Sequence, residues 1–243
     1  DGMPGMPRKQ GLAYWLSRKG YWVFYPRFRG CWESGGRFLR KSPEEDLKDV
    51  LDGLFKPFKE NTFGKKFRFN PKSIFVVGGS FGGAAAVLST LDPRVTAAVA
   101  NCPVVDWAIL REEERKETSN PSYTAYLKEA FGEAYRLSPR DWAKLYGGRF
   151  YNPAFRAAEI DPAKVLMFHA QDDPYVPWRS VAAFAEKTGA RLVLLKKGGH
   201  LSTNKTLPAH WRAIAAFFRK AEGHPGMNFS QTSRSRGPSN SKK

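Results

Sequence analysis

The sequence predicts an α/β domain built on a mostly parallel sheet that carries helices on both faces. Short apolar runs of strand length alternate along the chain with segments of helical periodicity. This alternation is typical of parallel sheets, because the connection between two parallel strands usually contains a helix. The chain has 243 residues, 42% of them hydrophobic, which is enough for one domain with a large core. We expect that domain to occupy residues 1–222.

Five apolar runs are the predicted strands. Each is uncharged and bounded by turn-forming or charged residues, as expected of strands that are buried on both faces. In chain order they cover residues 21–25, 74–77, 95–100, 165–169 and 192–195.

Helices are predicted between these strands and at the end of the domain. Leu12, Trp15 and Leu16 have helical spacing and Gly20 follows them, which indicates a helix over residues 7–19. Ser42 followed by Pro43 and two glutamates is a helix start, so a second helix is predicted over residues 43–60. Further helices are predicted from residue 84 and over residues 205–222. Residues 107–160 are charged and aromatic with no strand pattern, which predicts a helical insertion that caps a pocket.

The chain is strongly basic. It has 40 Lys and Arg against 23 Asp and Glu, a formal net charge of +17. Residues 223–243 carry four basic residues and no acid among Gly, Ser, Pro and Asn, and we expect them to form a disordered basic tail. A high positive charge attracts polyanions and anionic membrane surfaces. The basic residues are scattered and no nucleic-acid motif accompanies them, so a solvated basic surface is favoured over a specific nucleic-acid partner.

Several other classes of protein are not supported. No run of about 18 apolar residues is present, so no membrane span is expected. No signal segment opens the chain, which favours a cytoplasmic location. Cys31 and Cys102 cannot form a disulfide framework and are predicted to be free thiols. No metal-ligand spacing is found, and we expect no cofactor. The sequence predicts no particular oligomeric state.

A candidate nucleophile lies directly after the strand at 74–77. Gly78, Ser80 and Gly82 form the G-x-S-x-G pattern, with a strand before it and a helix after it. In such an elbow the serine occupies a strained turn, and its neighbours must be small because strand and helix pass close together. A glycine-rich turn can also bind phosphate, but the lysine of a P-loop is missing here. The pattern therefore predicts an α/β-hydrolase fold with Ser80 as nucleophile.

The base and the acid are expected on later loops, in the order Ser, Asp, His. Asp172 and Asp173 follow the strand at 165–169, and His200 follows the strand at 192–195. The spacing does not choose between the two aspartates; the one that does not orient the base is expected to cap the helix that starts near Pro177. The remaining histidines are predicted to lie at the end of a strand, inside the last helix and in the tail: His169, His210 and His224.

Four segments together resemble the catalytic domain of the prolyl oligopeptidase family and its single-domain esterase relatives. They are GGSFGG at 78–83, D-x-x-V-P at 173–177, GGH at 198–200 and P-x-x-R-G at 26–30, and the resemblance extends over most of residues 1–222. It implies a serine peptidase or carboxylesterase that works through an acyl-enzyme, with Asp173 as the acid. Residues 1–5 are similar to the family's H-G-x-P-G loop, with Asp1 in place of histidine. This implies that the backbone N–H groups of Met3 and Phe81 form the oxyanion hole.

The resemblance also implies that a strand is missing. In the family that loop follows a strand lying between the strands that correspond here to residues 21–25 and 74–77. We expect the chain to be a fragment that lacks the N-terminal part of the protein. If the position of that strand stayed unfilled, backbone groups of two buried strands would be unpaired. The alternative is a sheet that closes without that strand. The missing part would hold a few strands, as in the esterases, or a propeller as well.

Other residues have two interpretations. Trp32, Trp107 and Tyr175 either line a substrate pocket or are core and rim aromatics. Arg27 and Arg29 either bind an anionic part of a substrate or pair with structural carboxylates. For the whole chain, the alternatives are a carboxylesterase with no peptidase activity and a non-catalytic, polyanion-binding domain on a hydrolase scaffold.

Overall fold

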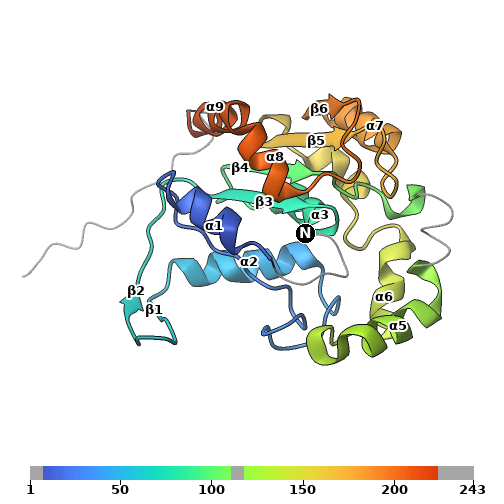
Figure 1. Ribbon diagram of the computed structural model, residues 1–243, viewed down its shortest axis with the longest axis horizontal. Coiled ribbons are helices and arrows are strands. Elements are labelled where there is room, and N and C mark those ends of the chain that lie inside the picture. The colour runs from blue at the N-terminus through green and yellow to red at the C-terminus, as the bar shows by residue number, and fades with distance from the viewer. Residues whose placement is uncertain (1–7, 111–117, 224–243) are drawn as a thin grey trace, which may run out of the picture.

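A computed structural model describes residues 8–110 and 118–223 of the chain. Its centre is a parallel sheet with the strand order β3-β4-β5-β6, and Figure 1 shows the four strands following one another in this order. The strands are β3 (Phe75–Gly79), β4 (Ala97–Asn101), β5 (Val165–Ala170) and β6 (Arg191–Leu195). Four of the five predicted strands and the predicted parallel sheet are therefore confirmed.

Helices connect and cover these strands. The α-helices are α1 (Gln10–Ser17), α2 (Pro43–Leu54), α3 (Phe81–Ser89), α5 (Pro121–Phe131), α6 (Pro139–Ala143), α7 (Trp178–Thr188), α8 (Thr203–Ala209) and α9 (Trp211–Glu222). Short 3₁₀ helices are η1 (Trp107–Ile109), η2 (Gly132–Ala134), η3 (Lys144–Gly147), η4 (Pro153–Glu159) and η5 (Pro162–Lys164). Within the described ranges, each helix is too short or too polar to cross a membrane.

The core forms two layers, one on each face of the sheet. Along β4, Ala98 and Ala100 belong to a cluster that contains α3 and α7, whereas Ala97 and Val99 belong to a cluster with α8 and α9. The alternation follows from the two-residue period of a strand, which sends successive side chains to opposite faces. Every residue of β4 and β5 is buried, as expected of interior strands covered by helices on both sides.

The prediction of a strand at residues 21–25 was wrong. This segment has no regular secondary structure, and Trp22 is 72% exposed. A strand needs a hydrogen-bonding neighbour, and no described strand lies beside this segment, so its apolar character alone does not make it one. Instead, Trp22 and Phe24 pack edge-on against Phe69, which follows a small antiparallel pair, β1 (Phe58–Lys59) and β2 (Lys66–Phe67). The sequence did not predict this pair, and the predicted helix over residues 43–60 is wrong at its end, because α2 ends at Leu54 and β1 follows it.

The predicted helix over residues 205–222 is also corrected, because it is two helices. Pro208 lies inside α8 and cannot donate a backbone hydrogen bond, and His210 separates α8 from α9 with φ −110°. His210 is therefore at the junction between two helices rather than inside one.

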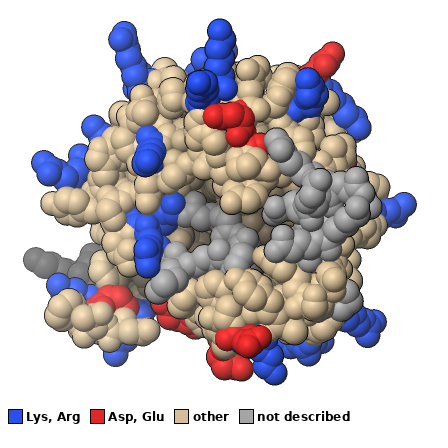
Figure 2. Space-filling model, turned by 45° about the vertical axis from the view of Figure 1, so that its right-hand side comes forward, with Lys and Arg blue, Asp and Glu red and all other residues tan. Residues whose placement is uncertain are grey.

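The insertion has the predicted character. Between residues 118 and 160 it contains helices and 3₁₀ turns, and the pair α5 and α6 lies apart from the sheet in Figure 1. Residues 111–117 and the predicted tail lie outside the described residues. Figure 2 shows basic side chains spread around one face of the molecule rather than gathered in a single patch. Cys31 and Cys102 are both buried free thiols, as predicted.

Candidate active site

Ser80 occupies a sharp turn between β3 and α3. Its backbone has φ 54° and ψ −120°, a conformation that non-glycine residues adopt only when the surroundings enforce it. Three backbone bonds hold it: the Ser80 N–H donates to the Asn101 carbonyl at 2.8 Å, and the Ser80 carbonyl accepts the N–H groups of Gly83 at 2.9 Å and Val104 at 3.3 Å. The strain is characteristic of the elbow that the motif predicts.

The glycines beside Ser80 are required by close backbone contacts. A Cβ atom on Gly78 would lie 1.9 Å from the Gly82 carbonyl oxygen, where no atom can fit. One on Gly83 would lie 2.8 Å from Cα of Pro103. Strand, turn and helix therefore pass so close together that only glycine fits, as the sequence predicts for an elbow.

The loop after β5 places Asp173 against His200. The carboxylate is 1% exposed, and its Oδ2 is 2.8 Å from His200 Nδ1. Its Oδ1 accepts the backbone N–H groups of Tyr175 and Val176 at 2.9 and 3.0 Å. Asp172 points elsewhere and accepts the backbone N–H of Gly199 at 2.8 Å. Of the two aspartates that spacing left open, Asp173 is thus the one that contacts the imidazole.

The surroundings keep Asp173 ionised. Burial by itself raises the pKa of the Asp173 carboxyl, but the hydrogen bonds from His200, Val176 and Tyr175 outweigh burial, and the pKa lies below its ordinary value of 3.8.

A carboxyl with a lowered folded-state pKa stabilises the fold above its unfolded pKa, and this contribution is lost as pH falls through the folded value. We therefore expect the free energy of unfolding to decline as pH is lowered from 3.8. Urea titrations across this range check it, with Asp173→Asn as the comparison: the variant should lose less stability on acidification than the wild type. An identical decline in both proteins contradicts the assignment.

Two neighbouring residues tie the serine loop to the histidine loop. Among the described residues the Ser80 hydroxyl has no hydrogen bond, a common state for a nucleophile without substrate. Asn101 accepts the Ser80 N–H through its backbone and donates its side-chain Nδ2 to the Leu201 carbonyl. Cys102 Sγ accepts the Leu201 N–H at 3.4 Å. The carbonyl and the N–H of Leu201 are therefore both hydrogen-bonded by residues at the end of β4.

Cys102 also contacts the acid. Burial, the charge of Asp173 and a hydrogen bond to that carboxylate all raise the pKa of the Cys102 thiol. The thiol is therefore protonated at neutral pH. The backbone of Cys102 has a positive φ of 44°. The predicted strand ended at residue 100 and Cys102 was predicted only to be a free thiol. No sequence signal marks the contacts of Asn101 and Cys102 with residues 173 and 201.

Asn101→Ala is expected to lower kcat by about 10- to 100-fold with little change in KM, because it releases the loop that carries His200. It should also lower the free energy of unfolding by about 1–3 kcal/mol, because the Leu201 carbonyl loses its donor. Steady-state kinetics and urea unfolding measure both. Asn152 is a buried asparagine of the insertion, bonded to Gly148 and Asp106. Asn152→Ala should lower stability but leave kcat unchanged; an equal loss of kcat in both variants would refute the positioning role of Asn101.

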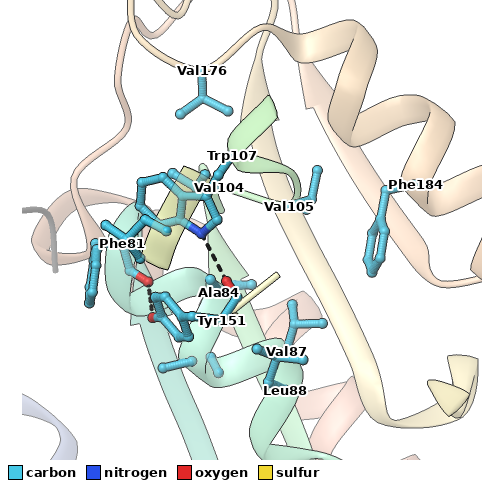
Figure 3. Close-up of a cluster of buried hydrophobic side chains, with 14 of the residues drawn as sticks. Phe81, Ala84, Val87, Leu88, Val104, Val105, Trp107, Tyr151, Val176 and Phe184 are labelled. Carbon is cyan, nitrogen blue, oxygen red and sulfur yellow. Dashed lines mark hydrogen bonds between the residues drawn. The ribbon is translucent and has the colours of Figure 1, made fainter. Parts of the chain in front are cut away.

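Aromatic residues of the insertion support the helix that begins after Ser80. Figure 3 shows Trp107 and Tyr151 beside Phe81, with ring centroids 5.7 and 4.7 Å from the Phe81 ring. The Tyr151 hydroxyl donates to the Phe81 carbonyl, and Trp107 Nε1 donates to the Tyr151 carbonyl at 2.8 Å. Trp107 is thus largely buried packing beneath the elbow. Tyr151 was missed, because nothing in the sequence distinguishes it from the other aromatics of the insertion.

The remaining predicted site residues have different positions. Tyr175 is 51% exposed, and its ring meets the His200 ring edge-on at 5.3 Å. Trp32 packs on Tyr135 and has no recorded contact with Ser80 or His200 among the described residues. Met3 lies outside the described residues. The arginines pair with carboxylates: Arg27 contacts Glu33, and Arg29 contacts Asp46 and Asp49.

One group of potential metal ligands occurs in the described part of the chain. Ligand atoms of Cys102, His169 and Asp173 lie within 4.8 Å of one another, and all three residues are buried. His169 Nε2 donates to the Val176 carbonyl at 3.0 Å, and burial lowers the pKa of this imidazole. Cys102 and Asp173 are already hydrogen-bonded to the loop that carries His200. We therefore interpret Cys102 and His169 as residues that hold the Asp173 loop in place.

Comparisons with known proteins identify a family and similar folds. A model of the Alpha/beta hydrolase family matches residues 10–217. The solved alpha/beta hydrolase GrgF from Penicillium sp. sh18 has 18% identity and a TM-score of 0.62, covering 88% of this chain and 84% of that one. The Pyrococcus furiosus esterase Pf2001 has 21% identity and a TM-score of 0.58, covering 87% and 74%. No curated protein matches. The predicted α/β-hydrolase fold is confirmed.

Proposed function

Because the chain belongs to the alpha/beta hydrolase family, we propose that it is a serine hydrolase that cleaves an ester or amide bond through an acyl-enzyme on Ser80. The observation that carries this proposal is the hydrogen bond between the buried Asp173 carboxylate and His200 Nδ1. Asn101 links the loop that carries His200 to the strained Ser80 turn. A carboxylate at Nδ1 holds that nitrogen protonated. Nε2 is then left as the base.

In the first half of the reaction, His200 Nε2 takes the Ser80 proton while the serine oxygen attacks the substrate carbonyl carbon. The Phe81 backbone N–H, at the start of α3, is a donor for the oxyanion that forms. The tetrahedral intermediate collapses, the bond to the leaving group breaks, and the imidazolium gives its proton to that group. Asp173 stabilises the imidazolium without accepting its proton.

In the second half, a water molecule replaces the leaving group. His200 removes a proton from the water, which attacks the acyl carbon. Collapse of the second intermediate breaks the bond to Ser80 and returns the proton to the serine oxygen. The carboxylic acid product leaves, and the enzyme is restored.

The class of substrate distinguishes two narrower versions of this proposal, a peptidase and a carboxylesterase. A prolyl oligopeptidase-like peptidase would hydrolyse an aminoacyl p-nitroanilide, whereas a carboxylesterase without peptidase activity would hydrolyse only a short acyl ester such as p-nitrophenyl butyrate. The similarity to an esterase of known structure supports testing the ester first. Parallel assays on the two chromogenic substrates distinguish the two.

Active-site labelling tests the proposal as a whole. A fluorophosphonate reacts with an activated serine, so mass spectrometry of the treated wild type should show one adduct on the peptide that contains Ser80. His200→Ala should remove the adduct because the serine loses its base. His210→Ala, which changes a histidine between α8 and α9, should keep it. A folded wild type that remains unlabelled would overturn the proposal.

A further inference from the structure

Residues 56–72 connect α2 to β3 and carry a concentrated positive charge. They include six basic residues and one acid, Glu60, which gives a formal net charge of +5. The basic residues are Lys56, Lys59, Lys65, Lys66, Arg68 and Lys72. β1 and β2 are the two strands of this segment, which we call the basic hairpin, and Figure 1 shows them apart from the sheet. The basic hairpin is therefore a charged projection from the domain.

The basic hairpin has an aromatic face and a basic face. Across its two strands Phe58 lies opposite Phe67, and Lys59 lies opposite Lys66. Successive residues of a strand point to opposite sides, so the two phenylalanines share one face and the two lysines share the other. The exposure agrees, because the phenylalanines are half-buried and the lysines are exposed. The lysines are thus presented to solvent side by side.

The charge of the basic hairpin is not neutralised by the protein. None of its six basic side chains forms a salt bridge within residues 8–110 and 118–223. Arg94, by contrast, pairs with both Asp52 and Asp92. Like charges directly opposite each other destabilise a strand pair, as in Lys59 and Lys66. An anionic partner on this face would relieve that repulsion.

The one acid of the basic hairpin is used by the turn between the strands. The Glu60 carboxylate accepts the backbone N–H groups of Thr62, Phe63 and Lys65 at 2.7 to 3.0 Å. Gly64 adopts φ 69°, a conformation that glycine adopts without strain. The turn therefore has a shape that its own residues define, and Phe63 lies at its tip.

The tip combines an exposed aromatic ring with lysines. Phe63 is 79% exposed, more than the other large apolar side chains that the structure describes. Lys65 Nζ lies 5.8 Å from the centroid of the Phe63 ring, and the pair Lys59 and Lys66 comes directly behind the turn. In interfacial membrane contacts, aromatic rings lie at the headgroup level and basic residues are attracted to anionic lipids. The tip has both features.

We propose that the basic hairpin binds an anionic membrane surface, with Phe63 entering the headgroup region and Lys59, Lys65 and Lys66 contacting the anionic headgroups. The aromatic face argues against a single-stranded nucleic acid, because the Phe58 and Phe67 rings are half-buried and stacked on each other at 5.9 Å, so they are not free to stack on bases. The net charge of +17 adds long-range attraction to an anionic surface.

This surface is separate from the candidate active site. The basic hairpin precedes β3, whereas Ser80 follows it, so the two lie beyond opposite ends of that strand. The proposal is independent of the chemistry at Ser80, and circular dichroism rather than activity serves as the check of folding in the variants below.

Sedimentation of the full chain with lipid vesicles tests the proposal. Vesicles of about 70% phosphatidylcholine and 30% phosphatidylserine should bind the protein, whereas pure phosphatidylcholine should not, and added salt should weaken the binding by screening. Lys59→Gln combined with Lys66→Gln should weaken binding at least about tenfold, because each basic residue near such a surface contributes about fivefold. Phe63→Ala should weaken it about tenfold with the same salt dependence, because it removes apolar contact only.

Matched controls remove the same groups elsewhere on the surface. Lys187 of α7 and Lys205 of α8 are exposed, and replacing both with glutamine lowers the net charge equally. Phe155 is an exposed phenylalanine of the insertion, 53% exposed. We expect the Lys187 and Lys205 double variant and Phe155→Ala to bind the anionic vesicles as the wild type does.

Three results would overturn the proposal. One is an equal loss of binding in the two double-lysine variants, which would mean that net charge and not the basic hairpin attracts the vesicles. Another is binding to pure phosphatidylcholine as strong as binding to the anionic vesicles. The third is salt-dependent binding of polyuridylate RNA with no binding of either vesicle, which would make the surface a nucleic-acid site.

Discussion

Replacing Ser80 with alanine is expected to lower kcat for p-nitrophenyl butyrate by up to about 10⁶, the loss seen when the nucleophile of a serine triad is removed. The reason is that Ser80 is the serine of the strained turn that Asn101 links to the loop carrying His200. The variant should fold, since alanine meets the same positive φ as serine does. Steady-state kinetics with active-site titration of the wild type measure the effect.

A second serine of the same helix is the matched control for Ser80→Ala. Ser89 is buried at the end of α3, and its hydroxyl donates to the Ala86 carbonyl. Ser89→Ala should keep the wild-type kcat. If Ser80→Ala retains more than a few per cent of the turnover in a protein free of contaminating esterase, the nucleophile has been assigned wrongly.

Asp173→Asn is expected to lower kcat by about 10⁴, as in other serine triads in which the acid is made neutral. An amide at this position can donate to Nδ1 and so favour the imidazole tautomer that has no lone pair on Nε2. The Tyr175 and Val176 N–H groups can still donate to the amide oxygen, so the loop should keep its shape. Kinetics at several pH values measure the loss.

The adjacent carboxylate provides the comparison for this variant. Asp172 accepts only the Gly199 N–H among the recorded bonds of the described residues, and an asparagine oxygen can accept the same bond. Asp172→Asn should therefore change kcat by less than about tenfold. If the two variants lose activity equally, removal of charge near His200 explains the loss, and the specific role of Asp173 is wrong.

What the sequence by itself determined is local and periodic. Apolar runs identified β3, β4, β5 and β6, because strands buried on both faces must be apolar throughout. The glycines around Ser80 predicted the tight turn, because a Cβ at Gly78 has no space. The order of loops placed the pair Asp172 and Asp173 at the same end of the parallel sheet as His200, where the contact between Asp173 and His200 is observed.

What only the tertiary structure decided depends on contacts between distant segments. Asp172 and Asp173 are chemically identical, and the packing of one loop decides which carboxylate meets His200. Asn101 bonds to Leu201, which is 100 positions away in the chain, and Tyr151 bonds to Phe81, which is 70 positions away. Residues 21–25 have strand composition but are not a strand, because a strand exists only where a neighbouring backbone accepts its hydrogen bonds.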